Sequence, residues 1–331
     1  MSNENEPERK KAKVISFINM KGGVGKTTLS IGVAAYLSEI EHKKVLVIDA
    51  DPQFNATQSL LDDYKSKETN EIVQNELKKL KRIDGKEHST DEIDESEFNY
   101  YSQKILGSSN NQNYENVKTI FRLFTPQTSL HNYGLPRKED LITTLTNHLD
   151  LLCGDLTLVV VNKSSDAAFS NRIKNFIKKN DLRTIYDYII IDCPPTLTIY
   201  TDSALIASDF YVIPNRIDRY SIIGINSLQQ SVNSLIDEMD IPLKCLGIVY
   251  TMFPKDIGVK QNRIKETFES KKVVNDLDIF DAHIGITNNV QNGVRGTNPI
   301  SYQNSRDDIQ AFVLELEQRI KLIDQVGNKN E

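Results

Sequence analysis

Residues 21–28 read Lys-Gly-Gly-Val-Gly-Lys-Thr-Thr, and the architecture of the chain can be worked out from them. They follow the β-branched run at 14–19 and precede a helical pattern at 29–37. Glycines between a buried strand and a helix let successive backbone N–H groups turn inward around an anion, and the helix N-terminus adds its dipole. The stretch therefore predicts a loop that binds the phosphates of a nucleotide.

The side chains of this loop suit a triphosphate. We expect Lys26 to reach the β- and γ-phosphates, the Thr27 hydroxyl to complete the coordination of Mg²⁺, and Thr28 to donate to the α-phosphate. The usual pattern has a glycine six positions before the lysine; here Met20 stands there, followed by a second lysine, Lys21. Lys21 is poorly placed to contact the phosphates of a nucleotide that its own chain binds. We therefore expect its charge to reach a nucleotide held by a second subunit. The predicted nucleotide-binding residues of the loop are Lys21, Gly22, Gly23, Val24, Gly25, Lys26, Thr27 and Thr28.

The loop and two further segments resemble the ParA/MinD family of deviant Walker ATPases, and most closely its ParA (Soj-like) partition ATPases. Residues 21–28 match the family signature Lys-Gly-Gly-x-Gly-Lys-Thr-Thr. Residues 45–57, Val-Leu-Val-Ile-Asp-Ala-Asp-Pro-Gln-Phe-Asn-Ala-Thr, look like its second motif, and residues 188–195, Tyr-Ile-Ile-Ile-Asp-Cys-Pro-Pro, look like the end of its Walker B strand. The resemblance covers about 1–61 and 117–325.

Both further segments are apolar runs that end in carboxylates, as parallel strands do where ligands bind outside their carboxyl ends. We expect Asp192 to hold Mg²⁺ through a water and Asp49 to share the outer shell of the metal. By resemblance, Asp51 positions or deprotonates the attacking water. The alternative for Asp49 and Asp51 is a helix cap or a turn before Pro52. The predicted catalytic residues are Lys21, Lys26 and Asp51, and the predicted metal site comprises Thr27, Asp49 and Asp192.

Two further sets of residues follow mainly from the resemblance. The family places the adenine base against the loops after the late strands, which implies contacts from Pro214, Thr251 and Met252. A protein that binds DNA without sequence preference needs only a basic face. The candidates for it are Arg216, Arg219, Lys255, Lys260, Arg263 and Arg295; the alternative for each is a solvated surface charge.

Apolar runs at 14–19, 45–48, 149–152, 158–161, 188–191, 210–213 and 246–251 alternate with helical stretches. This rhythm predicts an α/β fold, a doubly wound and mostly parallel sheet with helices on both faces. We expect a single domain over 1–331 with a flexible tail at 1–12. A polar insertion at 62–116, after the second strand, holds 8 basic and 13 acidic residues and so accounts for most of the net charge of −6.

Composition excludes several other classes of protein. Three cysteines without metal spacing indicate a reducing cytoplasm, and Cys153 and Cys193 do not supply the paired ligands of an iron–sulfur ATPase. No apolar run approaches the roughly 20 residues of a membrane span. A helix predicted at about 305–323 has one apolar face, which we interpret as core packing. Its acidic residues argue against MinD-type membrane targeting: Asp307, Asp308, Glu315 and Glu317.

The resemblance implies an ATP-dependent DNA-partitioning ATPase that is weakly active without a partner. Mg²⁺ and ATP would bring two copies face to face, the dimer would bind double-stranded DNA irrespective of sequence, and hydrolysis stimulated by a ParB-type centromere-binding protein would release it. The expected location is the cytoplasm, on the nucleoid. Two alternatives remain open at this stage: a nucleotide-gated scaffold with negligible turnover, and a MinD-like positioning ATPase whose cargo is a protein cluster.

Overall fold

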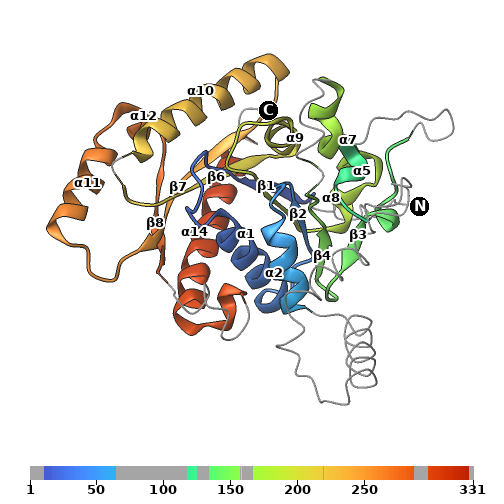
Figure 1. Ribbon diagram of the computed structural model, residues 1–331, viewed down its shortest axis with the longest axis horizontal. Helices are drawn as coiled ribbons and strands as arrows, with labels where there is room; N and C mark the ends of the chain where they lie inside the picture. Colours follow the sequence, from blue (N-terminus) through green and yellow to red (C-terminus); the bar gives the residue numbers. More distant parts are fainter. Residues whose placement is uncertain are drawn as a thin grey trace, which may run out of the picture.

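Short β-branched and apolar runs form the central strands of one eight-stranded sheet (Figure 1). The computed structural model describes residues 11–64, 118–124, 134–156, 158, 167–218, 220–286 and 297–327. Its strands are β1 (Lys13–Phe17), β2 (Val45–Asp49), β3 (Ile142–Thr144), β4 (Leu149–Leu152), β5 (Tyr188–Asp192), β6 (Phe210–Asn215), β7 (Lys244–Phe253) and β8 (Ile279–Gly285). They lie in the order β3-β4-β2-β5-β1-β6-β7-β8, and only β3 runs antiparallel to its neighbour.

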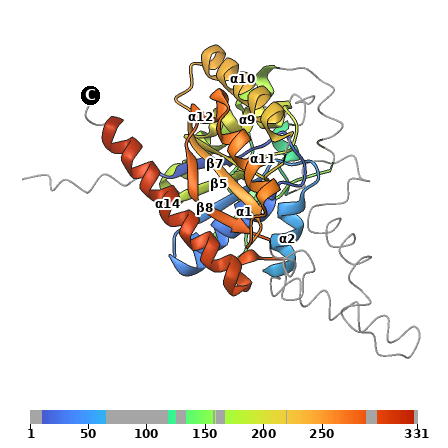
Figure 2. The ribbon, with the colours of Figure 1, turned by 90° about the vertical axis from the view of Figure 1, so that its left-hand side faces the viewer.

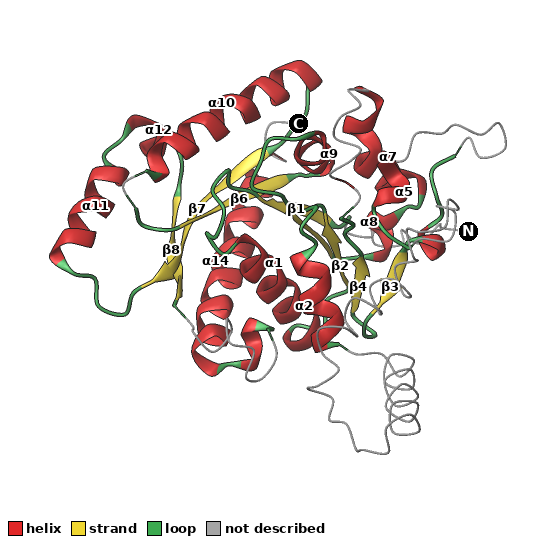
Figure 3. Cartoon of the chain, in the orientation of Figure 1, coloured by secondary structure: helices red, strands yellow, loops and turns green. Residues whose placement is uncertain are grey.

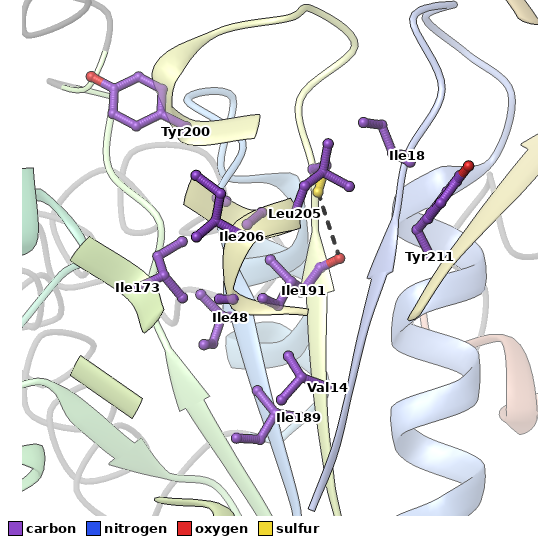
Figure 4. Close-up of a cluster of buried hydrophobic side chains, with 14 of the residues drawn as sticks. Val14, Ile18, Ile48, Ile173, Ile189, Ile191, Tyr200, Leu205, Ile206 and Tyr211 are labelled. Atoms are coloured by element: carbon purple, nitrogen blue, oxygen red, sulfur yellow. Dashed lines mark hydrogen bonds between the residues drawn. The ribbon is translucent and has the colours of Figure 1, made fainter. Parts of the chain in front are cut away.

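The central strands are buried on both faces because their side chains alternate between two hydrophobic cores. In β1, Val14 belongs to one core and Ile15 to the other, and both are fully buried. The same alternation holds for Ile189 and Ile190 in β5. Figure 4 shows the first core, where side chains of β1, β2 and β5 lie beside those of the helix at 199–207. Burial on both faces explains why these strands are nearly continuous apolar runs in the sequence.

Helices cover both faces of the sheet (Figure 3). One layer consists of α1 (Lys26–Ala35), a π-helical continuation (Tyr36–Ile40), α2 (Asn55–Asp63) and α14 (Gln303–Gly327). The other layer consists of α5 (Phe121–Phe124), α7 (Arg172–Lys179), α8 (Leu182–Ile185), α9 (Ile199–Ala207), α10 (Ser221–Met239), α11 (Val259–Glu269) and α12 (Lys272–Asn275). The predicted fold class, a doubly wound and mostly parallel sheet, is confirmed.

The long C-terminal helix α14 packs along the sheet beside β8 (Figure 2). It extends the predicted helix at both ends, and its apolar face lies in the core, as interpreted from the sequence: Ile309, Phe312, Val313, Leu316 and Ile320 are buried, and Ile323 is partly buried. Within the described ranges, no helix is long and apolar enough to cross a bilayer.

The structure differs from the predicted elements at three places. Strands β3 and β8 were not predicted, because β3 is only three residues long and β8 alternates apolar and polar residues. Leu158 is helical, whereas the sequence predicts a strand at 158–161; residues 159–161 lie outside the described residues. Most of the predicted insertion also lies outside them, since only 62–64 are described and 62–63 belong to α2.

The strand order places the predicted phosphate-binding loop at residues 21–28, hereafter the phosphate loop, at the point where the winding of the sheet reverses. From β1 the chain passes through α1 to β2 on one side, and later from β5 through α9 to β6 on the other. β1 therefore lies between β5 and β6. Ligands of open α/β sheets bind in the crevice outside the carboxyl ends of the strands at such a switch point.

Candidate functional site

The phosphate loop has the backbone conformation that its glycines predict. Gly23 and Gly25 have φ of 68° and 76°, in the left-handed region that favours glycine. Gly25 precedes the first residue of α1, and no described side chain caps that helix. The first N–H groups of α1 are thus free of side-chain partners, as a loop that receives an anion requires.

Lys26 is buried at the start of α1 although it carries a charge. It is 6% exposed, and its Nζ donates to the backbone oxygen of Lys21 at 3.3 Å. Burial lowers the pKa of Lys26, while the charges of Asp192 and Asp51 act in the opposite direction. The structure therefore brings the loop lysine together with two of the three predicted aspartates.

Thr27 connects the phosphate loop to the end of β5. Its hydroxyl donates to Asp192 Oδ2 at 2.8 Å, and the Ser30 hydroxyl lies 3.1 Å from Asp192 Oδ1. Asp192 is fully buried, and burial raises the pKa of its carboxyl, an effect that the hydrogen bond from Thr27 reduces. Two of the predicted metal ligands are thus in direct contact.

Asp49 uses both carboxylate oxygens in hydrogen bonds within its own segment. Its Oδ2 accepts from the backbone N–H and the hydroxyl of Thr57, both at 2.8 Å, and its Oδ1 accepts from the backbone N–H of Asp51 at 3.2 Å. Burial raises the pKa of Asp49 to about 8, and the charge of Asp192 adds to the effect. Asp49 therefore anchors the segment that carries Asp51 and the start of α2.

Gly154, at the end of β4, completes this anchor. Its N–H donates to the Thr57 hydroxyl at 2.7 Å. A Cβ at this position would lie 2.9 Å from Asp49 Cγ and 2.8 Å from Phe54 Cβ, closer than real Cβ atoms approach. Sequence reasoning missed both Thr57 and Gly154, since neither carries a charge.

Asp51 lies in the turn after β2 and is 6% exposed. Its Oδ1 accepts from the backbone N–H of Gln53 at 2.9 Å. Burial raises the pKa of this carboxyl, and the positive charge of Lys26 opposes the increase. The alternative interpretation of Asp51 as a turn residue before Pro52 is compatible with its bond to Gln53, but it does not account for the effect of the Lys26 charge on the pKa of Asp51.

Lys21 forms an ion pair within its own chain. Its Nζ contacts the carboxylate of Asp218, which follows β6. Burial lowers the pKa of Lys21, and the nearby charge of Arg216 lowers it further. The loops after β1 and β6 are also joined by Asn19, whose Nδ2 donates to the Pro214 oxygen at 2.7 Å.

The predicted adenine contacts lie at the same end of the sheet. The Thr251 hydroxyl donates to the Val24 oxygen at 2.6 Å, and Met252 has a φ of 50°, a strained value for this residue type. Sequence reasoning missed Asn215, the last residue of β6. It is 1% exposed, and among the described residues neither its Nδ2 nor its Oδ1 has a hydrogen-bond partner. A polar residue at the end of an apolar strand was the signal for it.

The candidate DNA-binding residues are divided between two places. Arg216 is exposed beside Lys21, at the nucleotide end of the sheet. Lys255, Lys260 and Arg263 are exposed on α11 and the loop before it, and none forms an ion pair with another described residue. Arg219 and Arg295 lie outside the described residues.

The oxygen ligands of this site suit Mg²⁺ better than they suit a metal that protein side chains alone coordinate. Over the described ranges, no group of three or more His, Cys, Asp or Glu side chains is arranged to hold a metal. Mg²⁺ usually keeps several waters and binds one or two carboxylates together with substrate phosphates. The Thr27 hydroxyl and the Asp192 carboxylate, beside an anion-binding loop, are such a set.

Comparisons with known proteins show which sequences and folds the chain is similar to. The chain is 26% identical over 268 residues to the chromosome-partitioning ATPase Soj of Treponema pallidum, covering 80% of this chain and 82% of that protein. Its fold matches a putative plasmid partition protein of Borrelia burgdorferi bound to AMPPNP, with a TM-score of 0.60, 19% identity and coverage of 92% and 100%. It also matches cobyrinic acid a,c-diamide synthase of Mycobacterium smegmatis with a bound ATP analogue and magnesium, with a TM-score of 0.61, 18% identity and coverage of 94% and 96%.

A family profile described as an AAA domain matches residues 12–245, a range that holds the phosphate loop and all three aspartates. We conclude that the chain belongs to the AAA_31 family of AAA domains, of the ParA/MinD type.

Proposed function

We propose that this protein is an ATP-dependent DNA-partitioning ATPase whose ATP-bound form is a dimer. The observation that carries the proposal is the 2.8 Å hydrogen bond between Thr27 and Asp192, beside the buried Lys26. It joins an anion-binding loop to a metal-binding carboxylate, which is the pairing that nucleotide hydrolysis needs. The relationship to a chromosome-partitioning ATPase supports the biological role.

Each residue of the site then has a distinct task. The loop N–H groups and Lys26 bind the phosphates, and Thr27 and Asp192 hold Mg²⁺. Bound Mg²⁺ would neutralise charge on the transferred phosphoryl group. Asp51 orients the attacking water, and its raised pKa favours acceptance of a proton from that water. Asn215 offers one donor and one acceptor to the edge of the adenine base.

Asp49 takes a positioning role in this proposal. Its two oxygens already accept hydrogen bonds from Thr57 and Asp51, so it contributes to the metal environment through the segment that it anchors. The sequence interpretation of Asp49 as an outer-shell metal residue is retained in that sense.

Lys21 reaches the nucleotide of the second subunit in the dimer. Its ion pair with Asp218 within the chain has to open before it can do so. ATP binding and dimer formation would therefore be coupled to the loop after β6, which also carries Arg216.

The dimer would bind DNA irrespective of its sequence. The contacts would come from exposed basic residues at the nucleotide end of the sheet and on α11. A separate ParB-type centromere-binding protein would stimulate hydrolysis and so release the DNA. The protein would then be located on the nucleoid. Affinity for DNA should appear with ATP and fall steeply with salt, because neutralised phosphates release counterions.

Replacement of Asp51 tests the hydrolytic role. We expect Asp51→Ala to bind ATP and DNA but to hydrolyse ATP at a rate reduced by at least about 100-fold, and to remain on DNA after the partner is added. The control is Asp202→Asn, which changes a half-buried carboxyl on α9. If Asp51→Ala hydrolyses ATP and leaves DNA as the wild type does, the proposed mechanism is wrong. Negligible hydrolysis by the wild type itself would support the nucleotide-gated scaffold.

A further inference from the structure

Ser30 lies one turn into α1 and is completely buried. Its hydroxyl lies 3.0 Å from the backbone oxygen of Thr27 and 3.1 Å from Asp192 Oδ1. A single hydroxyl hydrogen is thus shared between the preceding helical turn and the carboxylate at the end of β5. Position 30 lies outside the phosphate-loop motif at 21–28, and nothing in that motif requires a hydroxyl here.

Ser30 and Thr27 together occupy both oxygens of the Asp192 carboxylate. Thr27 takes Oδ2 at 2.8 Å and Ser30 takes Oδ1 at 3.1 Å. Residues three apart lie on one face of a helix, so the two hydroxyls of α1 hold the carboxylate from the same side. With both oxygens engaged, rotation of the carboxylate would cost a hydrogen bond to a buried charged group.

We propose that Ser30 is a positioning residue that holds the Asp192 carboxylate in the orientation in which Oδ2 meets the Thr27 hydroxyl, and so sets how strongly Mg²⁺ tightens nucleotide binding. This inference rests on the proposed function, because it requires that Thr27 and Asp192 hold the metal. In this proposal Ser30 acts through Asp192, with which its hydroxyl is in contact. Partners that orient a metal ligand typically change metal affinity about 10- to 100-fold when they are removed.

The competing explanation is that Ser30 is an ordinary buried helical serine bonded to the preceding turn. The chain offers a matched control for it. Ser38 is also buried, in the continuation of α1, and its hydroxyl donates to the backbone oxygen of Ala35 at 3.2 Å. Like Ser30, Ser38 thus donates to the backbone oxygen three residues earlier. Unlike Ser30, it forms no hydrogen bond to a carboxylate among the described residues.

The experiment is calorimetric titration of the purified chain with AMPPNP, in excess Mg²⁺ and again in EDTA. For Ser30→Ala we expect the affinity in Mg²⁺ to fall about tenfold, with a change of less than about twofold in EDTA. Ser30→Thr, which keeps the hydroxyl, should restore the Mg²⁺ effect, and Ser38→Ala should leave both affinities unchanged. Thermal unfolding of each variant verifies that it is folded.

Two results would overturn the inference: an unchanged Mg²⁺ effect in Ser30→Ala, or equal losses in Mg²⁺ and in EDTA, which indicate a structural role. If Ser30→Ala does not fold, Ser30→Cys keeps the volume with a weaker donor and should show the same selective loss in Mg²⁺. If the wild type itself takes up no AMPPNP, the proposed function fails and this inference fails with it. The two failures are therefore distinguishable.

Discussion

At the scale of single residues, three aspartates and one lysine from separate segments are removed from water at the same end of the sheet. Asp49 and Asp192 are fully buried, and Asp51 and Lys26 are each 6% exposed. Burial raises the pKa of each acid and lowers that of the lysine, so each charge depends on its neighbours. Removal from water also strengthens every electrostatic interaction with an incoming triphosphate.

The raised pKa of Asp49 predicts a pH dependence of stability. The folded carboxyl has a pKa of about 8, whereas an unfolded aspartate titrates at about 3.9. Between these values the folded state holds a proton that the unfolded state releases, so this contribution to stability is lost as the pH rises through 8. Asparagine at position 49 stays neutral at every pH. The free energy of unfolding of Asp49→Asn, measured without nucleotide, should therefore rise relative to that of the wild type from pH 5 to pH 9.

Urea unfolding of both proteins across this range measures the difference. The control is Asp181→Asn, which removes an exposed carboxyl at a left-handed position before α8 that asparagine also accepts. A flat difference between Asp49→Asn and the wild type would mean that Asp49 is ionised in the folded protein throughout.

Gly154 is expected to accept no side chain. A Cβ there would lie 2.9 Å from Asp49 Cγ and 2.8 Å from Phe54 Cβ. Gly154→Ala should lower the free energy of unfolding by about 1–3 kcal/mol, as overpacking of a tight core does. Gly224→Ala is the control, because nothing lies within 4 Å of its added Cβ on α10, and it should be neutral or stabilising. Equal thermal midpoints of the two variants would contradict the close packing around Asp49.

The charged residues of the site could be predicted from the sequence, because glycine spacing and strand-end acids have a direct chemical meaning. Thr57 and Gly154 could not, since their roles arise only when the ends of β2 and β4 meet. The bond between Lys21 and Asp218 joins residues almost 200 positions apart, and no local pattern encodes it.

At the scale of elements, the loop after β1 and the loop after β6 hold each other. Asn19 bonds to Pro214, and Lys21 pairs with Asp218, whose Oδ1 also accepts from the backbone N–H of Tyr220 at 2.8 Å. Lys21, which the proposed dimer needs across its interface, is thus paired with a residue of its own chain.

Asp218→Asn should ease dimer formation. Asparagine keeps an acceptor for Tyr220 N–H but loses the charge that holds Lys21. A partly exposed ion pair contributes about 0.2–1 kcal/mol, and each dimer opens two of them, so the protein concentration needed for the AMPPNP-bound dimer should fall about two- to thirtyfold. Sedimentation velocity measures it. Asp324→Asn, which removes the ion pair with Lys13 at 2.8 Å, is the control. A higher concentration requirement for Asp218→Asn would contradict the account.

The edge strand β8 shows why the sequence analysis missed an element. Its side chains alternate in burial because it lies at the edge of the sheet, and α14 packs against it. Glu315 of α14 accepts from the N–H groups of Asp281 and Ala282, and Asp308 accepts from that of Gly285. These carboxylates occupy backbone donors that an open edge would offer to another chain. The apolar runs that were predicted correctly are the central strands, where burial on both faces leaves an unbroken signal.

At the scale of the whole molecule, the nucleotide site and the basic residues of α11 are carried by different parts of one sheet. The residues 62–116 account for most of the net negative charge, so a basic face elsewhere is compatible with an overall charge of −6. Lys260 and Arg263 are exposed on α11, beyond β8 at one end of the molecule (Figure 1).

Replacing Lys260 and Arg263 together by alanine should weaken DNA binding and leave AMPPNP binding intact. If both contact phosphates, the slope of log affinity against log salt should fall by about two. Fluorescence anisotropy with AMPPNP, Mg²⁺ and a random duplex measures it. The control is Lys174→Ala with Lys178→Ala, exposed on α7 at the other end of the molecule. An unchanged affinity and slope would place the DNA contacts on another face.

In the proposed dimer, two copies of the chain share their nucleotides, and one lysine from each copy reaches the nucleotide of the other. Light scattering of the purified protein with Mg²⁺ and saturating AMPPNP detects this dimer. We expect a molar mass twice that of the 37.6 kDa chain, a single-chain mass with ADP, and a single-chain mass for Lys21→Ala even with AMPPNP. A single-chain mass for the wild type at saturating AMPPNP would contradict the proposed dimer.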